Sequence, residues 1–554
     1  MMNAFFERHR ATLERALQAI AERGYWSPYP ESPSPRNYGE GFVESGKAAF
    51  DALQNKPYAL DLPGAIGQVG SERSPYGFAL GITYPKVDLD RLFAAVAQAE
   101  KAWRKAGPET WVGVCLEILH RINRQSAVMA NAIMHTTGQA YMMAFQAGGP
   151  HAQDRGLEAV AYAWDEMRRI PGKALWEKPQ GKGEALRMEK RFRIVPRGVG
   201  LIIGVSTFPT WNGYTGLFAD LATGNAVIVK PHPDAILPLA ITVKIAREVL
   251  AEAGFDPNIV TLVAHEQGDP VAQQLALRPE VKLIDFTGSP ANGVWLETHA
   301  LQAQVFTEKA GVNQIVLDSS DDFKGVVRNI AFSLALYTGQ MCTAPQNIYV
   351  PRDGIDTSDG HLSFDEVAQA LAEGLRKLVG DPARAVEVLG AVQGKAVLER
   401  IETARRLGEV ILDSQDIRHP QFTEATIRTP LLVRLDHTDR DTYLHEWFGP
   451  ISFVVATESS EQSLDIAEKA VRERGALTLS VYSTRPQLIE RAIEVAENAA
   501  VALSINLTGG VFVNQSAAFS DFHGTGANPA ANAALTDAAY VASRFRVVQH
   551  RVHV

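Results

Sequence analysis

The sequence has very little cysteine: Cys115 and Cys342 are the two examples in 554 residues. So small a number excludes a disulfide framework and a cysteine-rich zinc site, and it fits a reducing cytoplasm. Long apolar runs are also missing, since the stretch 199–205 is far shorter than a membrane span and contains glycines. Residues 1–10 carry mixed charge where a secretory signal would need an apolar core. We therefore expect a cytoplasmic protein without a membrane segment.

The sequence lacks an excess of positive charge as well. It has 54 Lys and Arg against 63 Asp and Glu, a formal net charge of −9. This balance removes the general electrostatic attraction to nucleic acid or to an anionic membrane, so we expect a small-molecule partner instead. With 46% hydrophobic residues the chain can bury several cores, which favours two or three domains.

Apolar runs of strand length alternate with helix-like stretches in the middle of the chain. The four clearest runs are 200–205, 226–229, 260–263 and 282–286. This order is typical of βαβ units, in which helices cover a parallel sheet and ligands bind at the carboxyl ends of its strands. A second α/β unit is expected after residue 311.

The flanking segments have other patterns. Residues 88–162 have helical periodicity throughout, and 173–196 reads as a hairpin around a turn rich in Pro and Gly. The tail 540–554 alternates like an edge strand. Residues 1–60 are expected to form helices followed by a proline-interrupted loop, with a role that the pattern does not indicate.

The two cysteines have different surroundings. Cys115 lies in an amphipathic helix pattern and is expected in the core. Cys342 follows the small and polar run Tyr337-Thr338-Gly339-Gln340-Met341, which favours a reactive thiol. A thiol nucleophile needs a base, and Glu308, 34 residues earlier, is the candidate.

The segment 307–311, Thr-Glu-Lys-Ala-Gly, and its spacing to Cys342 resemble the aldehyde dehydrogenase family. The resemblance extends over roughly residues 90–530. It implies an α/β fold of two Rossmann-like α/β domains plus a small β-hairpin oligomerisation element, assembled as a homodimer or tetramer. The expected divisions are an N-terminal extension, 1–70; an NAD(P)-binding domain, 71–172 and 197–310; a catalytic domain, 311–530; and the oligomerisation element, 173–196 and 531–554.

The same resemblance implies a nicotinamide cofactor, NADP or NAD. Lys230 ends a strand and would bond the adenosine ribose. Three residues later, where the family has a glutamate for the ribose hydroxyls, this sequence has Pro233, which leaves NADP at least as well suited as NAD. His232 would either face the 2′-phosphate or be an ordinary loop histidine.

Two further motifs would complete the cofactor site. Gly288 and Ser289 would open a helix whose N-terminal amides face the pyrophosphate. In the motif 446–450, Glu-Trp-Phe-Gly-Pro, Glu446 would bond the nicotinamide ribose and Phe448 would lie against the ring. No metal is expected.

The implied reaction starts when the Cys342 thiolate attacks an aldehyde, and it ends when water activated by Glu308 hydrolyses the thioester. The position of the family's oxyanion-binding asparagine holds Thr207. Thr207 would substitute, or the oxyanion would bind the Cys342 backbone N–H and another group. Asn212 is a further candidate, although in a continuous helix it would lie about 140° from Thr207 and need an irregular backbone.

Residues 519–526 also depart from the family pattern, and Asp521 and His523 there would touch substrate or shape a turn. These departures resemble the branch that acts in aerobic phenylacetate degradation, which implies a ring-opened, coenzyme A-linked semialdehyde as substrate. Two other hypotheses stay open. One is a dehydrogenase that passes the acyl group to coenzyme A, although the presence of Glu308 favours hydrolysis; the other is a non-catalytic homologue.

Overall fold

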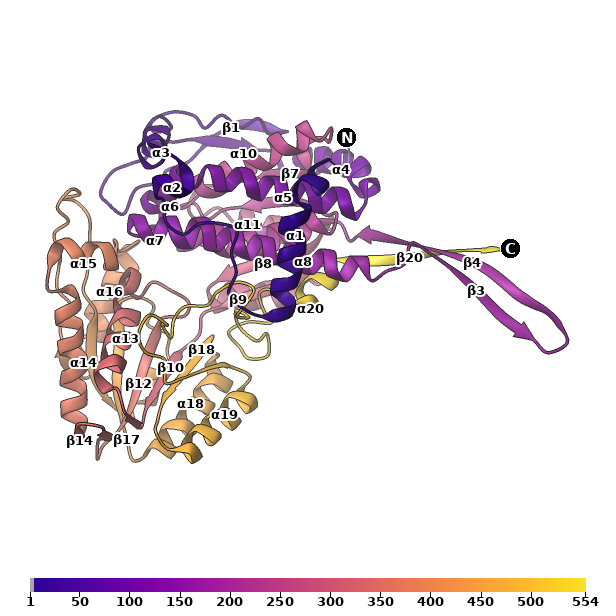
Figure 1. Cartoon of the computed structure of the whole chain (residues 1–554). Helices are drawn as coiled ribbons and strands as arrows, with labels where there is room; N and C mark the ends of the chain where they lie inside the picture. The colour runs from indigo at the N-terminus through magenta and orange to yellow at the C-terminus, as the bar shows by residue number, and fades with distance from the viewer. Residues whose placement is uncertain (1–3) are drawn as a thin grey trace.

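The computed structural model describes residues 4–554 and consists of two α/β lobes and a projecting arm (Figure 1). Residues 1–3, at the start of the predicted extension, lie outside the described part. The chain builds most of one lobe first, then the second lobe, and returns at its end to the first lobe and the arm. Among residues 4–554, no helix combines the length and apolar character needed to cross a membrane.

The first lobe contains a five-stranded parallel sheet in the order β7-β6-β5-β8-β9. Its strands are β5 (Val199–Ile203), β6 (Ala226–Lys230), β7 (Val260–Leu262), β8 (Val281–Gly288) and β9 (Gln304–Lys309). Strands β5 and β6 are buried along their whole length, because helices cover both faces of the sheet. Four strands match the predicted apolar runs. Strand β9 was missed, because its sequence Gln-Val-Phe-Thr-Glu-Lys is too polar for an apolar run.

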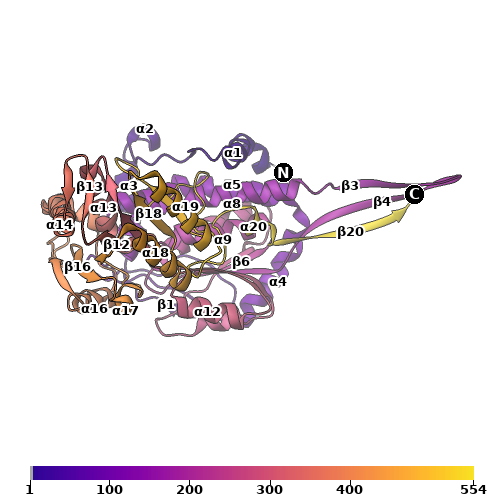
Figure 2. The same ribbon diagram turned by 90° about the horizontal axis from the view of Figure 1, so that it is seen from below.

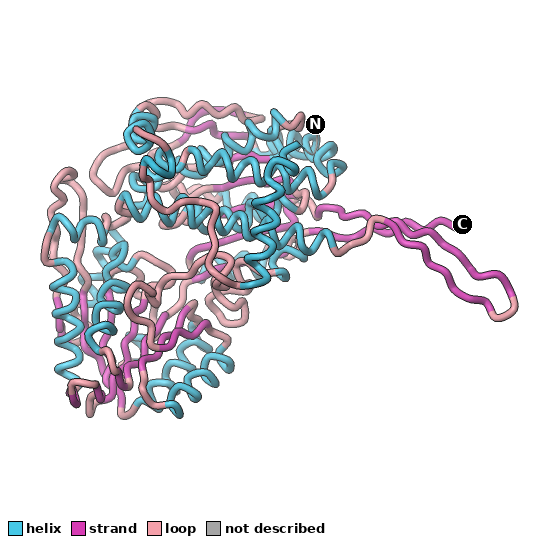
Figure 3. The backbone as a smooth tube through the Cα atoms, viewed as in Figure 1, coloured by secondary structure: helices cyan, strands magenta, loops and turns pink. Residues whose placement is uncertain are grey.

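Helices from the first part of the chain and from the βα connections surround this sheet (Figure 3). They are α4 (Leu89–Ala106), α5 (Pro108–Arg124), α6 (Ser126–Thr137), α7 (Tyr141–Gln146), α8 (Ala152–Arg168), α9 (Pro209–Ala222), α10 (Leu237–Glu252), α11 (Val271–Ala276) and α12 (Pro290–His299). The expected helical stretch 88–162 is thus confirmed. Helix α9 packs along α8, which places residues near 155 and 211 on adjoining elements.

The second lobe contains a seven-stranded sheet in the order β15-β16-β17-β12-β10-β18-β19. It is parallel except for the edge strand β15. Its strands are β10 (Asn313–Leu317), β12 (Pro345–Pro351), β15 (Glu409–Leu412), β16 (Leu431–Asp436), β17 (Ile451–Thr457), β18 (Thr478–Tyr482) and β19 (Ala502–Ile505). Its helices are α13 (Phe323–Ala335), α14 (Phe364–Val379), α15 (Pro382–Leu389), α16 (Lys395–Ala404), α17 (Arg440–Tyr443), α18 (Ser460–Arg474) and α19 (Pro486–Ala499). A small sheet of β11 (Ser319–Ser320), β13 (Ile355–Thr357) and β14 (Gly360–Leu362) lies beside it.

The arm is an antiparallel sheet of β3 (Lys173–Gln180), β4 (Gly183–Pro196) and β20 (Phe545–His553), which extends away from the body (Figure 2). The predicted hairpin and tail strand are both present. Residues 531–544, which we assigned to the arm, belong instead to the first lobe. The reason is Arg544, which is fully buried and donates from Nη1 to Asp220 at 2.6 Å and from Nη2 to Asp285 at 2.7 Å.

The N-terminal extension covers one side of the first lobe with α1 (Ala4–Glu22), α2 (Pro35–Tyr38) and α3 (Phe42–Asp51). Helix α1 packs on α5 and α8. The following hairpin joins β1 (Ala65–Val69) to β2 (Tyr84–Val87). After α1, Arg23 donates to the backbone carbonyl of Ser520 at 3.0 Å and lies over the ring of Phe522. The extension therefore supports the C-terminal loop that ends in the site described next.

Candidate active site

A cavity of about 760 Å³ lies between the two lobes, at the carboxyl ends of β5, β6 and β8. This is where a doubly wound sheet binds its ligands. The residues predicted from the sequence for the nucleophile, base, oxyanion and cofactor roles line it: Thr207, Asn212, Lys230, His232, Gly288, Ser289, Glu308, Cys342, Glu446 and Phe448. The cavity thus brings the expected nucleophile, base and cofactor residues together.

A short helical turn positions Cys342. Within it, Tyr337 and Thr338 both have φ of 53°, in the left-handed region that non-glycine residues rarely adopt. Buried hydrogen bonds hold this turn, such as the one from Thr338 Oγ1 to the carbonyl of Leu389 at 2.6 Å. Asn313 Nδ2 donates to the carbonyl of Cys342 at 2.7 Å. The nucleophile is therefore fixed at its backbone while its side chain reaches the cavity.

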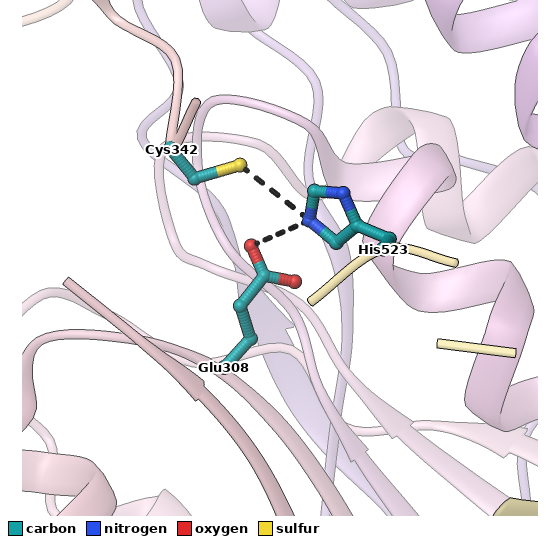
Figure 4. A group of neighbouring side chains, drawn as sticks. All are labelled: Glu308, Cys342 and His523. Atoms are coloured by element: carbon teal, nitrogen blue, oxygen red, sulfur yellow. Dashed lines mark hydrogen bonds and ion pairs between the residues drawn. The ribbon is translucent and has the colours of Figure 1, made fainter. Parts of the chain in front are cut away.

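The buried Glu308 carboxylate lies on β9, opposite the thiol. Asn212 Nδ2 donates to Glu308 Oε2 at 3.0 Å, and His523 Nε2 lies 3.2 Å from Oε1 (Figure 4). Burial raises the pKa of Glu308, but the imidazole and the Cys342 thiol outweigh burial and leave that pKa below its usual value. Glu308 is thus ionised at neutral pH, as a base for water must be.

The sequence left two roles open for His523, contact with substrate or the shaping of a turn. In the structure His523 lies beside Cys342 and Glu308. Its Nε2 lies 3.9 Å from Cys342 Sγ, and the Sγ, Nε2 and carboxylate atoms lie within 4.8 Å of one another. Trp211 packs edge-on against the ring, with centroids 4.6 Å apart. Burial and the Glu308 carboxylate raise the pKa of the Cys342 thiol well above its usual range. The thiol therefore needs a proton acceptor when it attacks.

Thr207 and Asn212 both reach the cavity, although helix α9 is regular. The 140° separation assumed a continuous helix and does not apply, because α9 begins at Pro209 and Thr207 lies in the irregular segment before it. Gln139 Nε2 donates to the Thr207 carbonyl at 2.9 Å and so fixes this loop. One of the two N–H groups of the Asn212 amide is engaged by Glu308, so the second N–H and the Thr207 hydroxyl are both candidate donors to an oxyanion.

The residues on the cofactor side fit a dinucleotide. Ser289 is the N-cap of α12, a ten-residue helix whose first-turn residue Asn292 also lines the cavity. A helix N-terminus at this place favours an anion such as a pyrophosphate. A Cβ on Gly288 would come within 2.8 Å of the Phe286 ring, so a side chain there would disturb the approach to this helix. Lys230 is buried, and among residues 4–554 no carboxylate lies within ion-pair distance of its ammonium group. Burial lowers its pKa to about 8, so it remains mostly charged at neutral pH.

The motif 446–450 lies at the opposite wall. Arg400 Nε donates to the carbonyl of Phe448 at 2.8 Å and fixes that loop. Burial raises the pKa of Glu446 to about 7. At neutral pH this carboxyl group is therefore about half protonated, and it can accept or donate a hydrogen bond.

Sequence reasoning missed several residues that hold the site. Arg155 on α8 is fully buried and donates to the carbonyl of Asp521 at 3.0 Å and to Ser516 Oγ at 3.2 Å, which fixes the loop that carries His523. Asn313 and Arg400 anchor the two walls in a similar way. None of these residues lies in a pattern that distinguishes it from a surface polar residue, so no sequence signal marked them.

Comparison with known proteins agrees with this geometry. A model of the aldehyde dehydrogenase family matches residues 83–528. The 1-pyrroline-5-carboxylate dehydrogenase of Geobacillus thermodenitrificans is 24% identical over 416 residues, which cover 73% of this chain and 75% of that protein. The benzaldehyde dehydrogenase of Bacillus subtilis is also 24% identical, over 73% of this chain and 80% of its own.

A solved structure gives a closer match. An NAD-dependent aldehyde dehydrogenase from Burkholderia multivorans has 67% sequence identity and a TM-score of 0.99, and the match covers 100% of this chain and 99% of that one. These similarities confirm the predicted fold class and enzyme class. The chain therefore belongs to the aldehyde dehydrogenase family, whose members are nicotinamide-dependent oxidoreductases.

Proposed function

We propose that this protein oxidises an aldehyde to its carboxylic acid with NAD(P), through a covalent intermediate on Cys342. The observation that carries the proposal is the shared cavity. In it the Cys342 thiol faces an ionised Glu308, and the residues expected to bind the dinucleotide line the adjoining wall. The thiolate attacks the carbonyl carbon and forms a thiohemiacetal. The bound nicotinamide supplies the hydride acceptor.

Glu308 acts in the second half of the reaction. Its carboxylate removes a proton from water, and the resulting hydroxide attacks the Cys342 thioester and releases the acid. Asn212 holds one carboxylate oxygen, which leaves Oε1 turned toward the thiol side. The presence of this base supports hydrolysis over transfer of the acyl group to coenzyme A.

The oxyanion of each tetrahedral intermediate needs donors. We assign this role to the Thr207 hydroxyl and the Cys342 backbone N–H. Thr207 is fixed through Gln139, so its hydroxyl is held at the cavity wall rather than on a mobile loop.

For the substrate we propose a ring-opened, coenzyme A-linked semialdehyde of aerobic phenylacetate degradation. The support is a resemblance: the departures from the common family pattern in 207–211 and 519–526 look like those of this branch. Two relatives are named for the oxidation of 1-pyrroline-5-carboxylate and of benzaldehyde, so proteins of this family act on unlike substrates. A turnover panel of aliphatic, aromatic and coenzyme A-linked aldehydes would rank these classes, and a preference for benzaldehyde would contradict the proposal.

Two variants test the covalent route. We expect Cys342→Ala to lower NAD(P)H formation by at least about 10⁴-fold, because the nucleophile is lost. Glu308→Gln should still give one burst of NAD(P)H and then stall, because the thioester forms but is not hydrolysed; mass spectrometry should find the acyl group on Cys342.

Cys115→Ala is the matched control, since Cys115 is buried in α5 and should leave turnover intact. Turnover that survives Cys342→Ala would disprove the covalent route. Free acid formed without added coenzyme A separates hydrolysis from acyl transfer.

A further inference from the structure

A histidine lies between the nucleophile and the carboxylate base, a position that the reaction above leaves without a role. We propose that His523 is a catalytic residue that takes the proton of the Cys342 thiol and holds the thiolate in an ion pair anchored by Glu308. The proposal rests on the proposed function in one respect, namely that Cys342 is the group that attacks the aldehyde.

The geometry assigns both contacts to one ring nitrogen. His523 Nε2 lies 3.9 Å from Cys342 Sγ and 3.2 Å from Glu308 Oε1 (Figure 4). The other nitrogen, Nδ1, lies 3.4 Å from Ser516 Oγ, which can accept its proton. Trp211 fixes the plane of the ring from the side. A histidine that only shaped a turn would not need to present Nε2 to both reacting groups.

Charge balance explains why the site needs this ring. A Cys342 thiolate beside the Glu308 carboxylate would place two negative charges within a few ångströms of each other in a buried pocket, which is costly. Burial and that carboxylate accordingly raise the thiol pKa. An imidazolium between the two reduces the net charge of the trio to −1 and supplies the positive neighbour that lowers a thiol pKa.

The charged groups around His523 come from several elements. Behind the ring, Arg155 donates from Nη2 to Ser516 Oγ at 3.2 Å, and its Nη1 is paired with Glu158 at 2.9 Å. On the loop of His523 itself, the Asp521 carboxylate accepts from the backbone N–H of Ala517 at 2.8 Å.

Glu446, on the cofactor side of the cavity, is a further acidic group near the Cys342 thiol, and its negative charge also raises the pKa of that thiol. Glu308 remains the charge in direct contact with Nε2.

The proton balance is closed without another reagent. During attack the S–H bond breaks, its proton goes to Nε2, and the sulfur electron pair forms the C–S bond. When the thioester is hydrolysed, the water proton goes to Glu308, the C–S bond breaks, and the departing sulfur recovers the proton from Nε2. Glu308 then gives its proton to bulk water, and the product leaves as the carboxylate with its own proton also released to water. The histidine thus serves the thiol, and Glu308 serves the water.

The test measures the thiol directly and needs no turnover. The rate of iodoacetamide modification of Cys342 would be followed by peptide mass spectrometry between pH 5 and pH 10, with EDTA present, in wild type, His523→Gln and His523→Ala. We expect a fast wild-type reaction that persists below pH 7. In His523→Gln the rate at pH 7 should fall about 10²-fold, and the profile should move to higher pH.

Three controls make the outcome decisive. His361→Gln changes an exposed histidine on β14 and should leave the profile unchanged. NAD affinity should stay unchanged in His523→Gln, which shows that the variant is folded. Added imidazole should restore fast modification of Cys342 in His523→Ala. If His523 only held the loop in place, free imidazole would not restore the rate.

An unchanged profile in His523→Gln, or a slow reaction of His523→Ala that imidazole does not rescue, would overturn the proposal. Failure of the proposed function would appear elsewhere, as turnover in Cys342→Ala.

Discussion

Asp234 is placed to discriminate between the two nicotinamide coenzymes. It lines the same cavity as Lys230, four residues after it, and its backbone N–H donates to His232 Nδ1 at 3.2 Å. Burial lowers the pKa of His232 to about 4, so the imidazole is neutral at pH 7 and offers no charge to a 2′-phosphate. The carboxylate of Asp234 would repel that phosphate and can accept hydrogen bonds from ribose hydroxyls. We therefore propose that NAD is the preferred coenzyme.

Replacing this carboxylate should change the preference. In Asp234→Asn we expect kcat/KM with NADP to rise about tenfold relative to NAD, because one repulsive charge is removed. Asp321→Asn, at an exposed position in the second lobe, is the control. Steady-state kinetics with both coenzymes measure the ratio, and an unchanged ratio would remove Asp234 from the selection.

At the residue scale, the sequence predicted the site residues that lie in short motifs. It did not predict the residues that reach the site only through the folding of distant segments. Lys230, Glu308 and Cys342 were predicted because each lies in a short motif, and all three line one cavity. The direction of a loop is not encoded in spacing, so His523 could be assigned either to substrate or to a turn. Arg155 is a single arginine in a helical pattern, and its burial follows from packing.

Among the elements, helix α10 has an unusual cap. Glu72, a buried residue between β1 and β2, accepts at Oε1 from the backbone N–H of Ile236 at 2.6 Å and of Leu237 at 3.1 Å. Tyr84 donates its hydroxyl to the other oxygen. A carboxylate at a helix N-terminus satisfies amides that have no partner within the helix. This contact also ties the segment after the N-terminal extension to the coenzyme-binding lobe.

Burial raises the pKa of Glu72 to about 7, and this makes stability depend on pH. The folded state then binds a proton more tightly than the unfolded state, so the free energy of unfolding should fall as pH rises from about 4.5 to 7, by at most about 3 kcal/mol. Glu72→Gln keeps an acceptor for both amides and should flatten this dependence. Urea unfolding at several pH values measures it; an equal slope in both proteins would contradict the assignment.

Strands were predicted where both faces are buried, because such strands are continuous apolar runs. Strand β9 was missed for the opposite reason: it carries Glu308 and Lys309 into the site, and that role makes its sequence polar. The arm strands were found through their alternation and the turn between them.

At the scale of the whole molecule, the arm exposes apolar side chains that no other part of residues 4–554 covers. Leu175 on β3 is 60% exposed, and Val548 on β20 is 43% exposed. Both strands are edges of the three-stranded sheet. Exposed apolar edges of this kind otherwise favour aggregation, so we propose that the arm pairs with another subunit in a dimer or tetramer.

A charge on the arm should therefore separate the subunits. We expect Val548→Asp to lower the mass measured by light scattering to that of a smaller assembly, because an aspartate cannot be buried unpaired in an apolar interface. Leu301→Asp changes an even more exposed apolar residue in the first lobe, at 81% exposure, and should leave the mass unchanged. A wild-type monomer, or a Val548→Asp variant of wild-type mass, would disprove the role of the arm.

The position of the active site between the two lobes also has a consequence for the chain during its synthesis. In sequence order, Glu308 lies in the last strand of the first sheet and Cys342 comes shortly before strand β12 of the second. His523 comes after the last strand of the second sheet. Domains emerge from the ribosome and fold in order. During synthesis the Cys342 thiol therefore exists for a time without His523, although Glu308 has already been made. With the role proposed for His523, we expect the thiol to react fast with aldehydes only after the last part of the chain has docked, so the unfinished enzyme should be the less reactive form.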